Sequence, residues 1–178
     1  MAAKYKKTCA EDMWERAPGQ TTTKACFMLR PLEEKGYIIP FNERGGGCGA
    51  AMRSMCLGYL GAVTAALFTA YAIQKIPPKK WGAGLLDDLP EVWEYIEKVG
   101  RDVEENNKAW GYFKNIWESY LELWSLTNGA SEPKFTVTYN IPERDAFYKS
   151  VSYAEWGGSS GHDAPIITYD ALMMTKDS

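Results

Sequence analysis

Residues 44–53, with the sequence RGGGCGAAMR, place four glycines in five positions directly before a stretch of helix-forming residues. Glycine reaches positive φ at little steric cost and lets another group approach the backbone closely. In a glycine loop that leads into a helix, the free N–H groups and the positive end of the helix dipole point at one spot, which suits an anion. The pattern predicts either such an anion site or a plain turn, because short glycine motifs also occur without a ligand.

Two enzyme motifs are formally matched but lack the context that they need. Residues 45–50, GGGCGA, fit the dinucleotide-binding fingerprint, which requires a preceding strand and an acidic residue about twenty positions later. Here Pro40 interrupts the preceding stretch, and the later region is uncharged. Residues 157–161, GGSSG, fit the nucleophile elbow of serine hydrolases, but His162 follows too closely to fold back onto the serine from another loop. We therefore expect neither a Rossmann site nor serine hydrolysis.

Three acidic residues and the histidine are the other candidates for chemistry. The pair His162 and Asp163 is predicted to be a loop histidine followed by an aspartate that caps a helix starting near Pro165. Asp87 and Asp88 are predicted to lie at a solvated helix end. None of these residues is predicted to bind a metal.

Composition places the chain among globular proteins and excludes several function classes. Its 178 residues are 46% hydrophobic and 24% charged, enough for one domain with a core. The net charge of -3 and the scattered basic residues argue against a positively charged surface that would bind nucleic acid. The four cysteines form no CxxC pair and the chain has one histidine, so the sequence lacks the ligand spacing of a usual zinc site. Because no apolar run follows Met1, we expect reduced thiols and a cytoplasmic location.

One uncharged segment, residues 54–74, is long enough to cross a bilayer. It is rich in Gly, Ala, Thr and Tyr and lacks the dense Leu, Ile, Val and Phe content that favours insertion. The segment is therefore predicted to be buried helix, with no membrane partner.

The elements that carry these residues are predicted to be nearly all helical. A long aromatic stripe, with spacings of three and four residues, marks an amphipathic helix whose aromatic side chains form core. Pro90 is predicted to separate two short helices, and a threonine among residues 21–23 to cap another. The predicted helices cover residues 2–14, a short stretch through 29, a stretch from about 50 to 76, and residues 85–89, 91–99, 104–126, 143–153 and those from 165 onward.

Long motifs spread along the chain, taken together, resemble the arginine-directed members of the ADP-ribosylglycohydrolase family. They are GGGCGAAMRSMCLG, YLGAVTAALFTAYA, WGAGLL, VEEN, KNIWESYL, PERDAFY and SYAEWGGSSGHDAPIITYDAL. The resemblance implies an all-α fold and hydrolysis of the N-glycosidic bond between ADP-ribose and an arginine side chain, assisted by a pair of magnesium ions. ADP-ribose and ADP-ribosylated proteins are the implied partners. The alternative is a non-catalytic remnant that binds ADP-ribose or another partner.

By the same resemblance, the glycine loop lets the backbone approach ADP-ribose, and the turn at residues 19–21 lies near the ligand. Tyr153 and residues 157–160 border the adenosine end, where the ring of Tyr153 can stack on adenine. The implied ligand-binding residues are Gly19, Gln20, Thr21, Gly45, Gly46, Gly47, Cys48, Gly49, Arg53, Tyr59, Tyr153, Gly157, Gly158, Ser159 and Ser160.

The sequence departs from the family pattern at three places. It contains neither the Ser-Asp-Asp-Thr type metal motif of the family's N-terminal part nor the C-terminal Gly-Asp-Ser-Asp-Ser motif. Near residues 58–59 it lacks an intervening segment with a Thr-His stretch. The resemblance thus implies a partial domain over residues 1–178, truncated and internally deleted, with unknown catalytic acids and no metal ligands. We expect the missing helices to uncover Trp110, Trp117 and Trp124.

Overall fold

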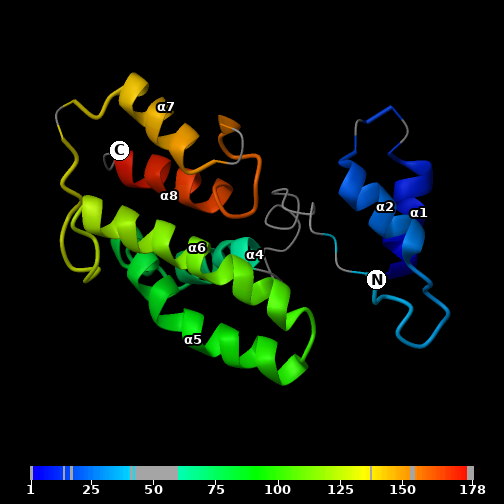
Figure 1. Ribbon diagram of the computed structural model, residues 1–178. Coiled ribbons are helices and arrows are strands. Elements are labelled where there is room, and N and C mark those ends of the chain that lie inside the picture. Colours follow the sequence, from blue (N-terminus) through cyan, green and yellow to red (C-terminus); the bar gives the residue numbers. More distant parts are fainter. Residues whose placement is uncertain are drawn as a thin grey trace.

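A computed structural model describes residues 2–13, 15–16, 18–40, 42, 60–136, 138–152 and 155–175. These ranges contain helices and no strand, which confirms the predicted all-α class. The helices are α1 (Ala2–Glu11), α2 (Gln20–Met28), α4 (Leu60–Ile73), the 3-10 turn η1 (Pro78–Lys80), α5 (Trp81–Val99), α6 (Val103–Leu123), α7 (Ile141–Ser150) and α8 (Ala164–Met174). Figure 1 shows α4 to α8 packed as a bundle, while α1 and α2 form a hairpin apart from it.

The core of the bundle is built on one face of α6. Its buried residues Phe113, Trp117, Tyr120 and Leu121 follow each other at spacings of one, three and four, so they share a face of the helix. They pack against fully buried side chains of the neighbouring helices, among them Leu85 of α5 and Ile166 and Tyr169 of α8. The prediction that the aromatic stripe of α6 forms core is confirmed.

The expected exposure of the tryptophans is wrong for two of them. Trp117 is 0% exposed, with Phe68 of α4 and Tyr169 of α8 at ring distances of 5.7 and 5.6 Å. Trp124 is 3% exposed because residues of the α6–α7 connection fold over it. The described residues of this chain thus cover both indoles themselves. Trp110 is half-buried and packs on Trp93 of α5 at 5.0 Å.

Helix α5 corrects the prediction of two short helices, because it continues through Pro90. Proline removes one backbone hydrogen bond from a helix interior. The buried side chains of Leu85 and Leu89 anchor the preceding turns against α6, and this packing outweighs the local cost. Asp87 and Asp88 consequently lie in the middle of a helix rather than at its end. Asp88 is half-buried and accepts a hydrogen bond of 3.1 Å from the hydroxyl of Tyr71.

The predicted threonine cap of α2 is also wrong. The N-cap position belongs to Gly19, and no side chain caps the helix. Thr23 lies inside the helix, where its hydroxyl donates a 3.2 Å bond to the Gly19 carbonyl. A threonine hydroxyl that bonds back to the carbonyl four residues earlier is common within helices.

Of the uncharged segment, residues 60–74 are described, and they form α4 and its C-terminal turn. The prediction of a buried helix is confirmed only at Gly61, Ala62 and Thr64, because most other residues of α4 are half-buried and Ile73 is exposed. No helix of the described ranges is both long and apolar enough to cross a membrane.

Candidate functional site

The loop of residues 157–163 is organised by a buried carboxylate. Asp163 is 0% exposed; its Oδ1 accepts a 2.8 Å bond from the backbone N–H of Ser160 and its Oδ2 a 3.1 Å bond from that of Gly158. Gly158 sits at φ +79°, where glycine is favoured over every other residue. The prediction of Asp163 as a helix cap therefore needs correction: it occupies the N-cap position of α8, but its side chain turns back and holds the loop instead.

The same loop lies directly against the first turn of α4. A Cβ atom built on Gly61 would stand 1.9 Å from the carbonyl oxygen of Gly161, a separation that no real Cβ tolerates. The absence of a side chain at Gly61 is what lets the two backbones meet. One turn later, Thr64 is also 0% exposed, and its hydroxyl donates a 2.8 Å bond to the Leu60 carbonyl. Residues one hundred positions apart thus meet at one corner of the fold, where α4 contacts loop 157–163.

His162 belongs to this corner and is a loop histidine, as predicted. Its ring meets that of Tyr112 of α6 edge-on, with centroids 5.1 Å apart. Burial lowers its pKa below the usual 6.5, although the adjacent Asp163 and a hydrogen bond to the Val151 backbone oppose that shift. Its Nε2 atom is buried and has no hydrogen-bond partner among the described residues.

The single histidine permits a direct test of this environment. Because the folded state disfavours charged His162, we expect its NMR titration to give a pKa below 6.5. A group whose folded pKa is depressed binds fewer protons than in the unfolded chain, so the protein should lose stability as the pH falls from 6.5 through the folded pKa. The 1H resonances of the only imidazole measure this without assignment. A pKa above 6.5 would contradict the buried placement.

The structure does not bring all the predicted ligand-binding residues together. Gly19, Gln20 and Thr21 lie at the start of α2, on the hairpin that Figure 1 shows apart from the bundle and from loop 157–163. A 2.9 Å hydrogen bond from Arg101 Nη2 to the Ile39 carbonyl links the hairpin segment to the bundle. The remaining predicted residues, Gly45, Gly46, Gly47, Cys48, Gly49, Arg53, Tyr59 and Tyr153, lie outside the described residues.

Sequence reasoning missed a second buried carboxylate, Asp170 of α8. Its Oδ1 accepts hydrogen bonds from the hydroxyls of Tyr120 (2.9 Å) and Tyr139 (3.1 Å), and its Oδ2 one from Tyr148 (2.8 Å). The guanidinium of Arg144 lies 3.7 Å from Oδ2. Burial, and then the Asp170 charge, raise the pKa values of Tyr120 and Tyr139. The available signal was a lone acid within the apolar helix APIITYDALMM.

The described residues do not fit the magnesium ions that the family resemblance implies. No group of three or more His, Cys, Asp or Glu side chains in the described ranges is placed to hold a metal ion. The two fully buried carboxylates, Asp163 and Asp170, already accept N–H and O–H bonds on all four oxygens. Magnesium requires carboxylate oxygens free to complete octahedral geometry. The described residues therefore form no magnesium site.

Comparisons with known proteins find several relatives, among them two ADP-ribose hydrolases by name, and no family model matches the sequence. The chain is 37% identical over 219 residues to ADP-ribosylhydrolase ARH1 of Dictyostelium discoideum, across 94% of the chain and 56% of that protein. It is 29% identical over 197 residues to the putative ADP-ribosyl glycohydrolase L444 of Acanthamoeba polyphaga mimivirus, across 90% of the chain and 37% of that protein. The chain thus spans about half, or less, of the length of these relatives. Both alignments are longer than its 178 residues, so each contains gaps in this chain.

Proposed function

This chain belongs to the ADP-ribosylglycohydrolase family, and from that premise we propose that it binds the ADP-ribose part of ADP-ribosylated arginine on proteins. The proposed family reaction is hydrolysis of the N-glycosidic bond to arginine, which releases ADP-ribose. For the 178-residue chain itself we propose binding without turnover, as a partial domain with an internal deletion near residues 58–59. The excess length of both alignments over the chain supports the internal deletion.

The observation that carries the binding proposal is the loop of residues 157–163, which is held by internal hydrogen bonds to Asp163. Asp163 holds the N–H groups of Gly158 and Ser160, so these donors are used inside the loop. Gly157 and Ser159 remain exposed on its rim, where they can border a ligand. A loop that is already ordered loses little conformational entropy when a ligand binds. This suits the predicted role of the loop beside the adenosine end of the ligand. There the loop would form one wall of the binding site, and N–H groups elsewhere in the chain would bind the diphosphate.

We propose impaired turnover because the buried carboxylates described in this chain are not available to hold magnesium. Magnesium, when bound in a family site, can polarise the glycosidic bond or activate water. In the described part of this chain the two buried acids already accept internal hydrogen bonds on every carboxylate oxygen, and the sequence lacks both acidic motifs of the family. We therefore propose that the magnesium ligands of the family come from the motifs that this sequence lacks.

We expect the purified chain to bind ADP-ribose in a calorimetric titration and to release none from an arginine-modified protein, with or without Mg²⁺. Asp163→Asn should weaken binding at least about tenfold, since the amide NH₂ that replaces one carboxylate oxygen leaves one of the two backbone N–H donors without an acceptor and disorders the loop. The matched control is Asp145→Asn on α7, where the side chain is exposed.

Each half of this proposal can fail separately. Turnover that disappears with EDTA and returns with Mg²⁺ would show an assembled active site in the chain. A folded chain that takes up no ADP-ribose at millimolar concentration would reject the binding assignment while leaving the family membership intact.

A further inference from the structure

The turn between α5 and α6 has a backbone conformation that few residue types adopt readily. It joins Val99, the last residue of α5, to Val103, the first residue of α6. Within it Gly100 lies at φ +66° and Asp102 at φ +53°, both in the left-handed region. Glycine reaches that region at little cost, whereas aspartate does so less often and against a steric penalty. A non-glycine residue in this region indicates that the surrounding contacts hold it there.

Asp102 uses its side chain for Arg101 rather than for α6. It occupies the N-cap position, where aspartate is one of the preferred residues, but it caps none of the described N–H groups of the helix. Its Oδ2 lies 3.3 Å from Nε of Arg101 instead. The helix holds Asp102 through its carbonyl, which accepts a 2.7 Å bond from the side chain of Asn106 and a 3.0 Å bond from the backbone N–H of the same residue. The carboxylate is thus free to orient the guanidinium.

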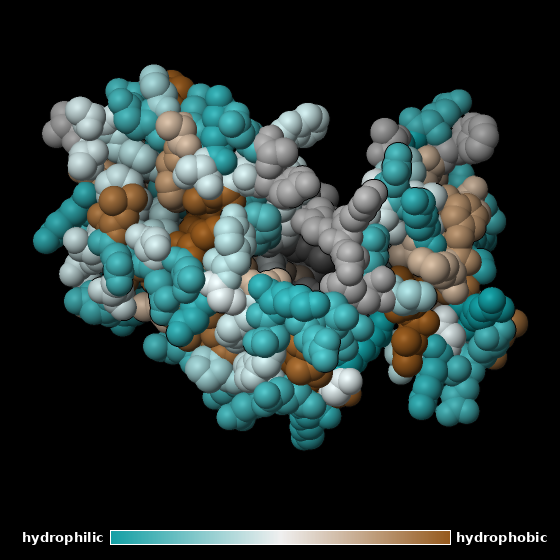
Figure 2. All heavy atoms as spheres, viewed as in Figure 1, coloured by the Kyte–Doolittle hydropathy of each residue, from teal (hydrophilic) through white to brown (hydrophobic). Residues whose placement is uncertain are grey.

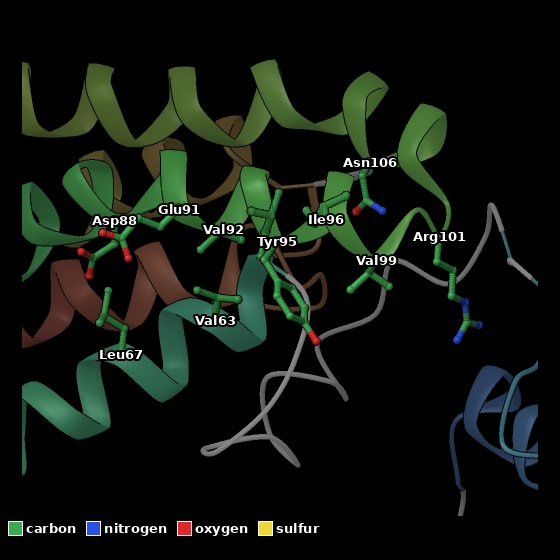
Figure 3. Close-up of a pocket in the computed structure, with 11 residues that line it drawn as sticks. Val63, Leu67, Asp88, Glu91, Val92, Tyr95, Ile96, Val99, Arg101 and Asn106 are labelled. Atoms are coloured by element: carbon green, nitrogen blue, oxygen red, sulfur yellow. The ribbon is translucent and has the colours of Figure 1, made fainter. Parts of the chain in front are cut away.

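Arg101, oriented in this way, reaches the N-terminal hairpin. Its Nη2 donates the 2.9 Å hydrogen bond to the carbonyl of Ile39, which lies 62 residues earlier in the chain. Because Nε and Nη2 belong to one planar group, a carboxylate at Nε limits the directions in which Nη2 can point. Figure 3, a view into an apolar pocket lined by α4 and α5, shows the Arg101 side chain extending away from the end of α5 towards the blue helices of the hairpin.

The carbonyl that accepts this bond is fixed to the hairpin. The loop after α2 closes on itself, because the N–H of Arg30 donates a 2.7 Å bond to the carbonyl of Gly36, and that of Ile38 a 2.8 Å bond to the carbonyl of Lys35. A Cβ built on Gly36 would lie 1.9 Å from the carbonyl oxygen of Arg30, so the two backbones are in close contact. Ile39 follows directly. Figure 2 shows the hairpin as a separate lobe beside the bundle, so a bond across this boundary can set how the lobe lies.

We propose that Arg101 is a positioning residue that fixes the place of the N-terminal hairpin on the helical bundle, and that Asp102 acts through it. The two residues lie in a turn whose backbone is itself held, so little conformational freedom is lost when the bond to the hairpin forms. The hairpin carries the turn of residues 19–21, whereas loop 157–163 belongs to the bundle. Arg101 thereby sets how these two parts of the predicted ligand site lie relative to each other. The placement itself does not depend on the proposed ADP-ribose binding.

Small-angle X-ray scattering of the full, monomeric chain measures this placement without any ligand. Arg101→Gln removes both contacts and should increase the radius of gyration and the maximum dimension, while helical circular dichroism stays at the wild-type level. Asp102→Asn should shift both dimensions in the same direction by less, because asparagine also accepts the left-handed backbone but carries no charge. The matched control is Lys98→Gln, which removes one positive charge from an exposed side chain of α5 and should leave the scattering unchanged.

The double variant, Arg101→Gln with Asp102→Asn, should scatter like Arg101→Gln alone, because Asp102 is proposed to act only through Arg101. A larger molecule in the double variant would contradict that role of Asp102. Wild-type scattering from Arg101→Gln would overturn the whole proposal, as would an equal increase in Lys98→Gln. If Arg101→Gln loses helical circular dichroism, Asp102→Asn decides instead, and unchanged scattering from that variant overturns the proposal. Loss of helical signal in both variants would assign the pair to the stability of the fold rather than to the placement of the hairpin.

Discussion

Replacing Asp170 by asparagine is expected to lower the free energy of unfolding by about 3–5 kcal/mol. The carboxylate is fully buried and accepts three tyrosine hydroxyls, with a guanidinium 3.7 Å away. An amide offers one oxygen and turns its NH₂ group towards donors that need acceptors. At least one buried hydroxyl then has no partner, and Arg144 loses its counter-charge. Because a domain of this size is stable by about 5–15 kcal/mol, the loss is a large part of the total.

Urea unfolding followed by tryptophan fluorescence measures this loss, since seven tryptophans report on the core. Asp145→Asn on α7 is the control, because the same chemical change on an exposed side chain should alter stability by less than about 0.5 kcal/mol. Tyr139→Phe removes one of the three donors and should cost less than Asp170→Asn. Equal unfolding curves for Asp170→Asn and the wild-type chain would show that the carboxylate does not hold α6, α7 and α8 together.

Replacing Gly61 by alanine is expected to separate α4 from loop 157–163. The new Cβ would meet the carbonyl oxygen of Gly161 at 1.9 Å, and a backbone atom cannot rotate away as a flexible side chain can. One of the two segments must move, at a cost of about 1–3 kcal/mol for such overpacking. Since this loop is proposed to border bound ADP-ribose, we also expect at least about a tenfold loss of ADP-ribose affinity.

The control is Gly111→Ala on α6, where nothing lies within 4 Å of the built Cβ. Alanine is favoured over glycine in a helix interior by up to about 1 kcal/mol, so this variant should be neutral or more stable. Thermal melts and ADP-ribose titrations of both variants give the comparison. If Gly61→Ala behaves like Gly111→Ala in both, the close backbone contact at Gly161 is not part of the folded protein.

Local periodicity was sufficient to predict the helical class and the core face of α6. The spacing of Phe113, Trp117 and Tyr120 is a property of consecutive residues, and it requires no knowledge of what the helix packs against. Helix ends were predicted less well. Pro90 and the threonines of α2 carry local preferences, and at Pro90 the packing of Leu85 and Leu89 overrides them.

The candidate site was also predictable only in part from the sequence. Glycines and serines marked the loop at residues 157–161, and a long family resemblance assigned it to ADP-ribose. The sequence could not indicate that Asp163 turns back onto Gly158 and Ser160, because a capping role fits the same residue equally well. Nor could it indicate the contact with Gly61, one hundred residues earlier.

The sequence by itself thus determined which segments are helices, which faces are apolar and which family the chain resembles. Only the tertiary structure decided that Asp163 and Asp170 are buried, that Gly61 meets Gly161, and that described residues of α4 and α5 line an apolar groove. A buried carboxylate depends on donors brought from distant parts of the chain: the three hydroxyls at Asp170 lie 22 to 50 residues away. Such donors leave no trace in the local pattern, because their positions exist only once the helices have packed.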